Sequence, residues 1–130
     1  MSDEIRTMNH MVRMLHTSDV HIGHVKGPGE HHADVCQCPA LGLAAAVLEH
    51  QADVLMISGD LFDHARLSDI TVGATLEIVA SPGVPVVIIP GNHDVHDTKS
   101  LWERCRSDVQ RTGVHLLDRL EGSSLVLESK

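Results

Sequence analysis

Aromatic residues are almost absent from this chain: only Phe62 and Trp102 are aromatic among 130 residues, and there is no tyrosine. A core built from this chain must be aliphatic, and a hydrophobic content of 42% is enough for one domain. No apolar run approaches the roughly 18 residues of a membrane-spanning helix, and no charged leader with an apolar centre is apparent. We therefore expect a soluble, cytoplasmic protein with no membrane association.

Basic residues and cysteines are also few. Ten Lys and Arg against 18 Asp and Glu give a formal charge of -8, which argues against a nucleic-acid binder that relies on a basic surface alone. The three cysteines lack the spacing of a zinc finger and fit a reducing compartment, and we interpret Cys36 and Cys38 as a structural or incidental pair. Histidine, in contrast, occurs 11 times, and imidazole suits transition metals.

Three apolar runs predict buried parallel strands, because they show no polar alternation and are too short for free helices. They lie near residues 11–17, 52–57 and 86–89, and each is followed by polar side chains. After the second run, Gly59 permits a tight turn that exposes Asp60 at the carboxyl end of the strand. Ligands bind at this edge of an open α/β sheet.

The other two strand ends carry further candidate ligands. Asp19 and His21 follow the first strand, and two residues of spacing on an extended chain would point both to one side. Asn92, His93 and Asp94 follow the third strand. A single Gly-Asp is more often an ordinary turn, but three such clusters closing three strands predict one metal site.

The remaining pattern alternates helices with strands, which predicts an α/β fold with a parallel, doubly wound β-α-β-α-β-α-β sheet. Residues 1–10 are predicted to be a disordered tail, and residues 11–130 form the domain. The first expected helix, 39–51, would bury Leu41, Ala44, Ala45 and Leu48. The others are a helix capped by Ser68 and ending at Ala80, a helix from Ser100 to about Gly113, and short strands at 114–117 and 124–128.

Carboxylate, amide and imidazole ligands suit divalent ions such as Mn²⁺, Fe or Zn²⁺. A carboxylate can bridge two ions about 3.5 to 4 Å apart, and Asp60 in the middle cluster is the natural bridge. Such a centre lowers the pKa of bound water and holds phosphoryl oxygens, so it suits phosphoester hydrolysis by a metal-bound hydroxide. We expect two divalent ions, with Mn²⁺ preferred.

Three motifs together resemble those of the calcineurin-like metallophosphoesterases: Asp19-x-His21, Gly59-Asp60-x-x-Asp63 and Gly91-Asn92-His93-Asp94. Within that superfamily, residues 15–23 and 59–63 are most similar to the SbcD-type DNA repair exonucleases, and the resemblance covers residues 11 to about 120. It implies the amino-terminal half of a four-layer αββα sandwich. It also implies a phosphodiester substrate such as DNA, a homodimer and an ATPase partner.

The resemblance also implies a role for each residue. Asp19 and His21 would bind the first metal, Asp60 would bridge, and Asn92 would bind the second. His93 would protonate the leaving oxygen or stabilise the transition state, with Asp94 orienting its ring; the alternative for His93 is a third metal ligand. Asp63 would order its loop as a hydrogen-bond acceptor.

One departure from the family pattern affects activity. Family members carry downstream histidines, including a Gly-His-x-His motif, and no such motif follows Asn92 here. We therefore expect an amino-terminal portion whose 130 residues alone are inactive, although the intact parent is a hydrolase. Two other readings stay open: a phosphoesterase for a small molecule or a phosphoprotein, which the acidic charge would suit, and a metal-binding fragment without catalysis.

Overall fold

The computed structural model describes residues 11–24, 36–94, 100–119 and 122–128. Strands and helices alternate along the chain, as the sequence predicts. The elements are β1 (Met14–Thr17), α2 (Cys38–Glu49), β2 (Val54–Ser58), α3 (Asp69–Ala80), β3 (Val86–Ile89), α4 (Leu101–Arg104), α5 (Arg106–Thr112) and β4 (His115–Leu116). None of the helices in these ranges is both long and apolar enough to cross a membrane. The expected tail, 1–10, lies outside the described residues.

The four strands form one parallel sheet in the order β1-β2-β3-β4, which confirms the predicted parallel α/β fold. Leu15, Leu55 and Val86 lie in register on the face that packs against the helices. The opposite face carries Met14 and Ile89, both exposed. Since side chains alternate between faces along a strand, this register places one apolar set in the core.

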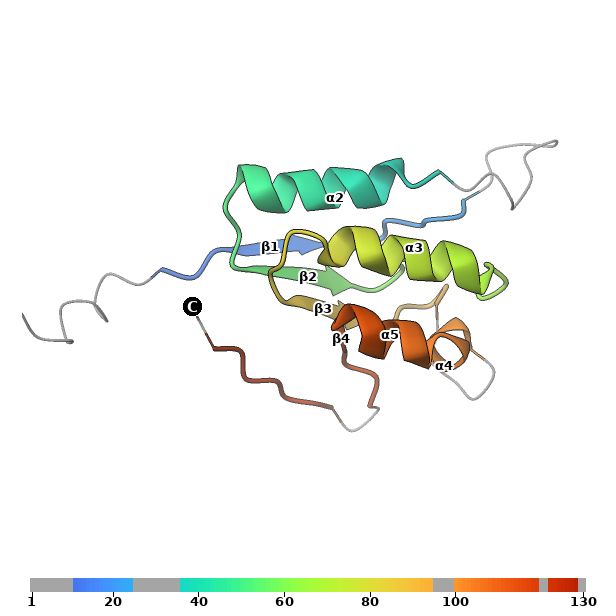
Figure 1. The fold of residues 1–130 in the computed structure, drawn as a ribbon. Helices are drawn as coiled ribbons and strands as arrows, with labels where there is room; N and C mark the ends of the chain where they lie inside the picture. Colours follow the sequence, from blue (N-terminus) through green and yellow to red (C-terminus); the bar gives the residue numbers. More distant parts are fainter. Residues whose placement is uncertain (1–10, 25–35, 95–99, 120–121, 129–130) are drawn as a thin grey trace, which may run out of the picture.

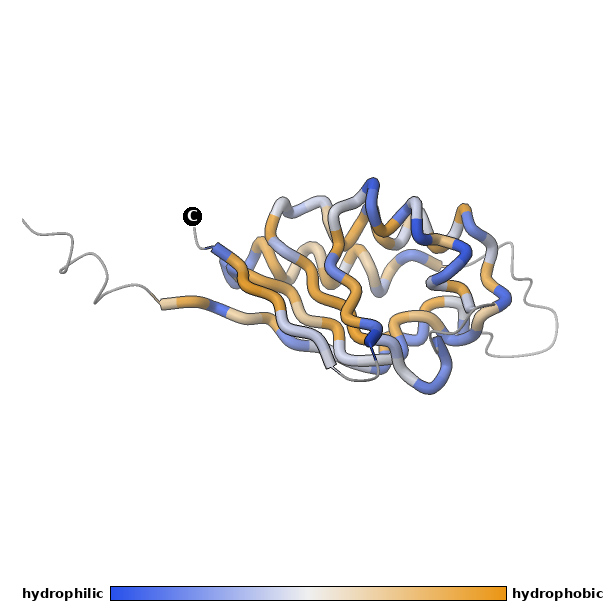
Figure 2. The backbone as a smooth tube through the Cα atoms, turned by 90° about the horizontal axis from the view of Figure 1, so that it is seen from below, coloured by the Kyte–Doolittle hydropathy of each residue, from blue (hydrophilic) through white to orange (hydrophobic). Residues whose placement is uncertain are grey.

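The winding of the sheet differs in one detail from the expected doubly wound arrangement. A doubly wound sheet changes direction once and has helices on both faces. Here each new strand is added on the same side, so right-handed crossovers place α2, α3 and α5 in one layer over one face (Figures 1 and 2). The order of elements along the sequence does not specify on which side of the sheet each strand is added.

The helix ends follow the predicted capping residues. Ser68 caps α3 by accepting a hydrogen bond from the backbone N–H of Thr71 at 3.2 Å, and Ser100 caps α4 in the same way from Glu103 at 3.2 Å. Gly113 ends α5 in the left-handed conformation, with φ of 76°. The single helix expected from Ser100 to Gly113 is instead two helices, broken at Cys105.

Two expectations about apolar patterns are wrong. In α2 the buried stripe consists of Ala40, Ala44 and Val47, whereas Leu41, Ala45 and Leu48 are exposed. Ala40 and Val47 belong to the core cluster that also contains residues of the sheet and of α3, so contact with these neighbours, and not hydrophobicity alone, decides which face of α2 is buried. Within residues 122–128 no strand forms, although 124–128 was expected to be one, because that segment pairs with no described strand.

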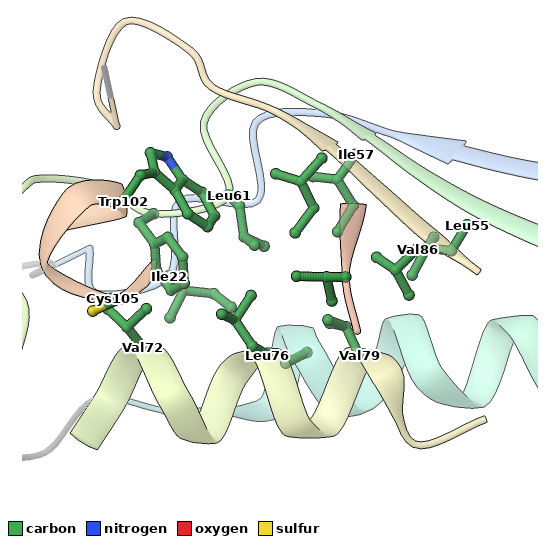
Figure 3. Packing of buried hydrophobic residues seen from close by; sticks show 14 of the residues in the cluster. Ile22, Leu55, Ile57, Leu61, Val72, Leu76, Val79, Val86, Trp102 and Cys105 are labelled. Atoms are coloured by element: carbon green, nitrogen blue, oxygen red, sulfur yellow. The ribbon is translucent and has the colours of Figure 1, made fainter. Parts of the chain in front are cut away.

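The core lies between the sheet and the helix layer. Leu55 and Ile57 of β2 and Val86 of β3 face Leu76 and Val79 of α3 (Figure 3). At the end of the sheet where the loops gather, the two aromatic residues pack together, with the ring centroids of Phe62 and Trp102 5.4 Å apart. The core is therefore aliphatic along the sheet, as expected, and aromatic below the loops that follow β2 and β3.

A pair of leucine substitutions tests the corrected helix packing. Leu76→Ala in α3, where the side chain is 0% exposed, should lower the free energy of unfolding by about 2 to 5 kcal/mol, because it leaves a cavity. Leu48→Ala in α2, where the side chain is 64% exposed, should change it by less than about 0.5 kcal/mol. Urea denaturation of both variants measures the difference. A large loss for Leu48→Ala would restore the face predicted from sequence.

Candidate metal centre

Backbone hydrogen bonds join the three loops that follow β1, β2 and β3. The N–H of Asp19 donates to the carbonyl of Gly59 at 3.0 Å, and that of His21 donates to the carbonyl of Asp60 at 2.9 Å. Gly59 donates in turn to Ile89 at 2.9 Å. Parallel pairing therefore continues past the strand ends, and it brings the predicted clusters to one edge of the sheet.

Asp19, His21 and Asp60 all have left-handed backbones, with φ of 57°, 52° and 55°. This conformation is unusual for residues other than glycine and costs on the order of 1 to 3 kcal/mol at each position. The extended geometry expected for Asp19 and His21 is therefore wrong, because each residue turns the chain. Their side chains still meet, since the loop hydrogen bonds hold both turns in place.

The ligand atoms of His21, Asp60 and His93 lie within 4.8 Å of one another. His21 Nε2 is 4.0 Å from Asp60 Oδ2 and 3.6 Å from Asp19 Oδ1. The rings of His21 and His93 meet edge to face, with centroids 4.8 Å apart. Asp60 is buried, whereas the Asp19 side chain is 65% exposed at the rim of the cluster. Asn92, the other predicted ligand, is exposed next to His93.

Asp63 orients both histidines of the cluster. Its carboxylate Oδ1 lies 3.0 Å from His21 Nδ1, and its backbone carbonyl lies 3.0 Å from His93 Nδ1. Both oxygens act as acceptors, so Nδ1 carries the proton in each ring and Nε2 keeps a lone pair for a ligand. The prediction of Asp63 as a hydrogen-bond acceptor agrees with these contacts, which also show what its acceptor atoms position.

His24 is a neighbour that the sequence motifs do not include. Its Nδ1 lies 3.7 Å from Asp63 Oδ2, the oxygen that His21 does not use. The carboxylate of Asp63 thus lies between two imidazoles. The sequence offered one indication of His24, its position three residues after His21. Two histidines at this spacing are also common in loops that form no site.

Asp94 is fully buried, and its contacts differ from the role expected for it. Its Oδ1 accepts hydrogen bonds from the N–H groups of Gly91 at 2.6 Å and Asp60 at 3.3 Å, and its Oδ2 accepts one from Phe62 at 3.1 Å. Burial raises the pKa of the Asp94 carboxyl, while these three donors favour the ionised form. The ring of His93 is held by Asp63 and not by Asp94, so Asp94 joins the β2 and β3 loops through their backbones.

Gly91 leaves room for the Asp60 carboxylate. A Cβ at this position would overlap Asp60 Oδ1 and would lie 2.5 Å from the Asp60 backbone nitrogen. The same Oδ1 accepts a hydrogen bond from the N–H of His93 at 2.9 Å. Asp60 Oδ1 is therefore fixed by the β3 loop, and Oδ2 faces His21.

The donor chemistry fits a divalent transition metal. Two imidazoles with free Nε2 atoms and one carboxylate suit Mn²⁺, Fe or Zn²⁺ better than a soft ion or Ca²⁺. His21, Asp60 and His93 can hold one such ion, and Asp19 and Asn92 lie beside them at exposed positions. Each of these five residues was expected at the site from sequence, but His93 was expected in a different primary role.

Comparisons with known proteins identify the family of this chain. Residues 12–124 match the family model of the calcineurin-like phosphoesterases. The DNA double-strand break repair protein Mre11 of Methanopyrus kandleri is 33% identical over 91 residues, which are 68% of this chain and 20% of that protein. A subunit of the nuclease SbcCD from Rhodobacter capsulatus is 29% identical over 118 residues, 84% of this chain and 27% of that protein.

Among solved structures, the Pseudomonas putida nuclease MPE superposes with a TM-score of 0.54 at 26% identity, covering 89% of this chain and 50% of that one. The chain thus spans only 20% and 27% of the two curated relatives. The matched region contains all three loops of the candidate metal centre. On this match, which covers most of its length, the chain belongs to the calcineurin-like phosphoesterase family.

Proposed function

We propose that this protein is a metal-dependent phosphodiesterase that cleaves DNA, of the SbcD exonuclease type. The observation that carries the proposal is the cluster of His21, Asp60 and His93 at the carboxyl edge of the sheet. Two relatives are named as a DNA double-strand break repair protein and a nuclease subunit, and the superposed structure is a nuclease. Those names support DNA as the substrate class.

Two divalent ions, with Mn²⁺ preferred, would be held by Asp19, His21, Asp60 and Asn92, and Asp60 would bridge them. The Asp60 carboxylate suits that role because Oδ1 and Oδ2 face different neighbours, the β3 loop and His21. When bound, the ions would activate water and neutralise charge on the phosphoryl oxygens.

The chain's own groups position the substrate and move protons. The exposed ring of His93 is fixed through Nδ1 to the Asp63 carbonyl, which leaves Nε2 facing away from that contact. In the imidazolium form, Nε2 would give its proton to the leaving oxygen as the phosphodiester bond breaks. A ring bound to metal through Nε2 could not do this, so the two roles of His93 exclude each other. Asp63 would orient His21 whether His93 acts as the general acid or as a metal ligand.

A second candidate function is hydrolysis of a small phosphate ester or a phosphoprotein. The observation that favours it is the formal charge of -8, because polyanionic DNA is attracted to basic surfaces. The third reading, metal binding without catalysis, uses the same ligands. The word "subunit" in the name of the Rhodobacter relative supports a further proposal, that this protein works in a complex, with a second copy and an ATPase as the proposed partners.

Substrate preference tests the function directly. With millimolar Mn²⁺, a protein containing this site should hydrolyse linear DNA and a chromogenic phosphodiester in preference to a phosphomonoester. These 130 residues alone should bind Mn²⁺ but turn over very slowly, since they supply three donors to one ion and two to the other, and water must fill the rest of the five or six positions at each. Preference for the phosphomonoester would favour the second candidate. Fast turnover by the 130 residues would show that these ligands suffice.

Two substitutions separate metal binding from proton transfer. Asp60→Asn should abolish turnover and weaken Mn²⁺ binding, because it removes the bridging charge. His93→Ala should keep most Mn²⁺ binding while lowering the rate of the chemical step by roughly 10² to 10⁴-fold, as for loss of a general acid. Equilibrium dialysis followed by metal analysis measures binding in both.

Asp53→Asn at the opposite end of β2 is the matched control and should leave both quantities unchanged. Equal loss of metal from His93→Ala and Asp60→Asn would assign His93 as a ligand and not as the acid.

Gly91→Ala tests the packing of the Asp60 carboxylate without touching a ligand. The added methyl group must displace Asp60, so Mn²⁺ affinity should fall about tenfold or more, a change of at least about 1.4 kcal/mol. Gly42→Ala is the control: a Cβ there has no neighbour within 4 Å, and alanine in a helix should add about 0.5 to 1 kcal/mol of stability. Isothermal titration with Mn²⁺ compares the two. Unchanged affinity in Gly91→Ala would show that Asp60 is not a ligand.

A further inference from the structure

Two thiols outside the metal centre share the start of α2. Cys36 precedes the helix and Cys38 is its first residue, and both side chains are exposed. The helix runs back along the sheet, so its first turn lies at the end of the molecule toward which β1 and β2 point (Figure 1). The third cysteine, Cys105, is buried between α4 and α5. The chain thus has one exposed pair and one enclosed thiol.

The backbone between the two cysteines is bent and anchored. Gln37 has φ of -91° and ψ of 7°, close to helical values, and helical geometry puts Cα atoms two residues apart at about 5.4 Å. That separation lies inside the range of about 4.4 to 6.8 Å found in disulfides. The Gln37 side chain donates to the Thr71 carbonyl at 3.3 Å and accepts from Thr75 Oγ1 at 2.9 Å. The turn therefore holds the two Cα atoms at a separation that a disulfide can span, and Cys36 Sγ is turned toward Cys38, whose backbone nitrogen lies 3.3 Å away.

The two sulfurs have different environments. Cys36 Sγ accepts a hydrogen bond from the backbone N–H of Cys38 at 3.3 Å. Contact with Cys38, through its thiol and through its backbone N–H, lowers the pKa of Cys36. The pKa of Cys38 is raised by the same contact and by the charge of Cys36. Cys36 is thus the better nucleophile at neutral pH, and Cys38 stays a thiol beside it.

We propose that Cys36 and Cys38 form a reactive dithiol that exchanges with small-molecule disulfides and closes an intrachain disulfide. The Cys36 thiolate attacks one sulfur of the small disulfide, and the other sulfur leaves as a thiolate that takes up a proton. Cys38, after losing its proton, attacks Cys36 Sγ and expels the second small thiol. Two protein thiols lose two electrons in total, and one small disulfide becomes two thiols.

Metal binding is a weaker explanation of this pair. Structural zinc takes four protein ligands, and this pair supplies only two. A soft metal ion would have to be held by the two sulfurs alone. Within the described ranges, the one group of three or more His, Cys, Asp or Glu side chains close enough for an ion is His21, Asp60 and His93, which contains neither thiol. Exchange chemistry needs only the two sulfurs that the turn supplies.

Glutathione disulfide, intact-protein mass spectrometry and peptide mapping test the proposal at neutral pH without denaturant. The unsubstituted chain should lose two hydrogen atoms, retain no adduct, and yield a peptide in which Cys36 and Cys38 are joined. Cys38→Ser should accumulate a glutathione adduct on Cys36, because the resolving thiol is gone. Cys36→Ser should react several-fold more slowly than Cys38→Ser.

Cys105→Ser is the matched control. Burial raises the pKa of Cys105 to about 11, so that thiol should not react, and its replacement should leave the exchange unchanged. Circular dichroism of each variant checks that it is folded. Stable adducts on both exposed thiols of the unsubstituted chain, or equal rates for Cys36→Ser and Cys38→Ser, would overturn the proposal.

Discussion

The buried carboxylate of Asp94 is the contact on which the site depends most. An ionised carboxylate without partners in a protein interior is very costly, and Asp94 is buried with three backbone N–H donors as its partners. Two of these donors, Asp60 and Phe62, belong to the loop after β2, and Gly91 belongs to the loop after β3. One side chain thus fixes the distance between two loops. Because Asp60 has a left-handed backbone, that support also offsets the conformational cost at the predicted bridging ligand.

Asp63 has a comparable effect on the histidines. Its carboxylate accepts from Nδ1 of His21, and its backbone carbonyl accepts from Nδ1 of His93. With the proton on Nδ1, the Nε2 atom of each ring is left to bind a ligand. The residue follows Asp60 by three positions, so a single short loop supplies the central carboxylate and the groups that orient both imidazoles. The ligand atoms of His21, Asp60 and His93 lie within 4.8 Å of one another although they come from three separate loops, and the contacts of Asp63 tie the other two loops to the one after β2.

The sequence predicted the edge of the sheet and the residues gathered there, because parallel strands and their carboxyl ends follow from apolar runs and polar clusters. Capping at Ser68 and Ser100 was also predictable, since a serine just before a helix usually accepts a hydrogen bond from a backbone N–H of the first turn. Properties that depend on tertiary packing were not predictable. The buried stripe of α2 is the one that joins the core cluster, and the break at Cys105 directly follows Arg104, whose side chain donates to the carbonyls of Ala65 and Leu67 in the loop after β2. Two of the three partners of Asp94, Asp60 and Phe62, lie 34 and 32 positions away along the chain, which a motif cannot specify.

Charge links the metal centre to the kind of substrate it can bind. Asp19, Asp60, Asp63 and Asp94 lie together in a chain of formal charge -8, so the unmetallated edge of the sheet repels a phosphodiester. The first turns of α2 and α3 face the same edge and contribute only partial positive charge. Bound divalent ions would make the electrostatic potential at this edge positive. In the proposed chemistry they would be the largest positive charges near the substrate. In the proposed function, metal binding would be a condition for substrate binding as well as for the chemical step, so loss of a ligand would raise KM and lower kcat together.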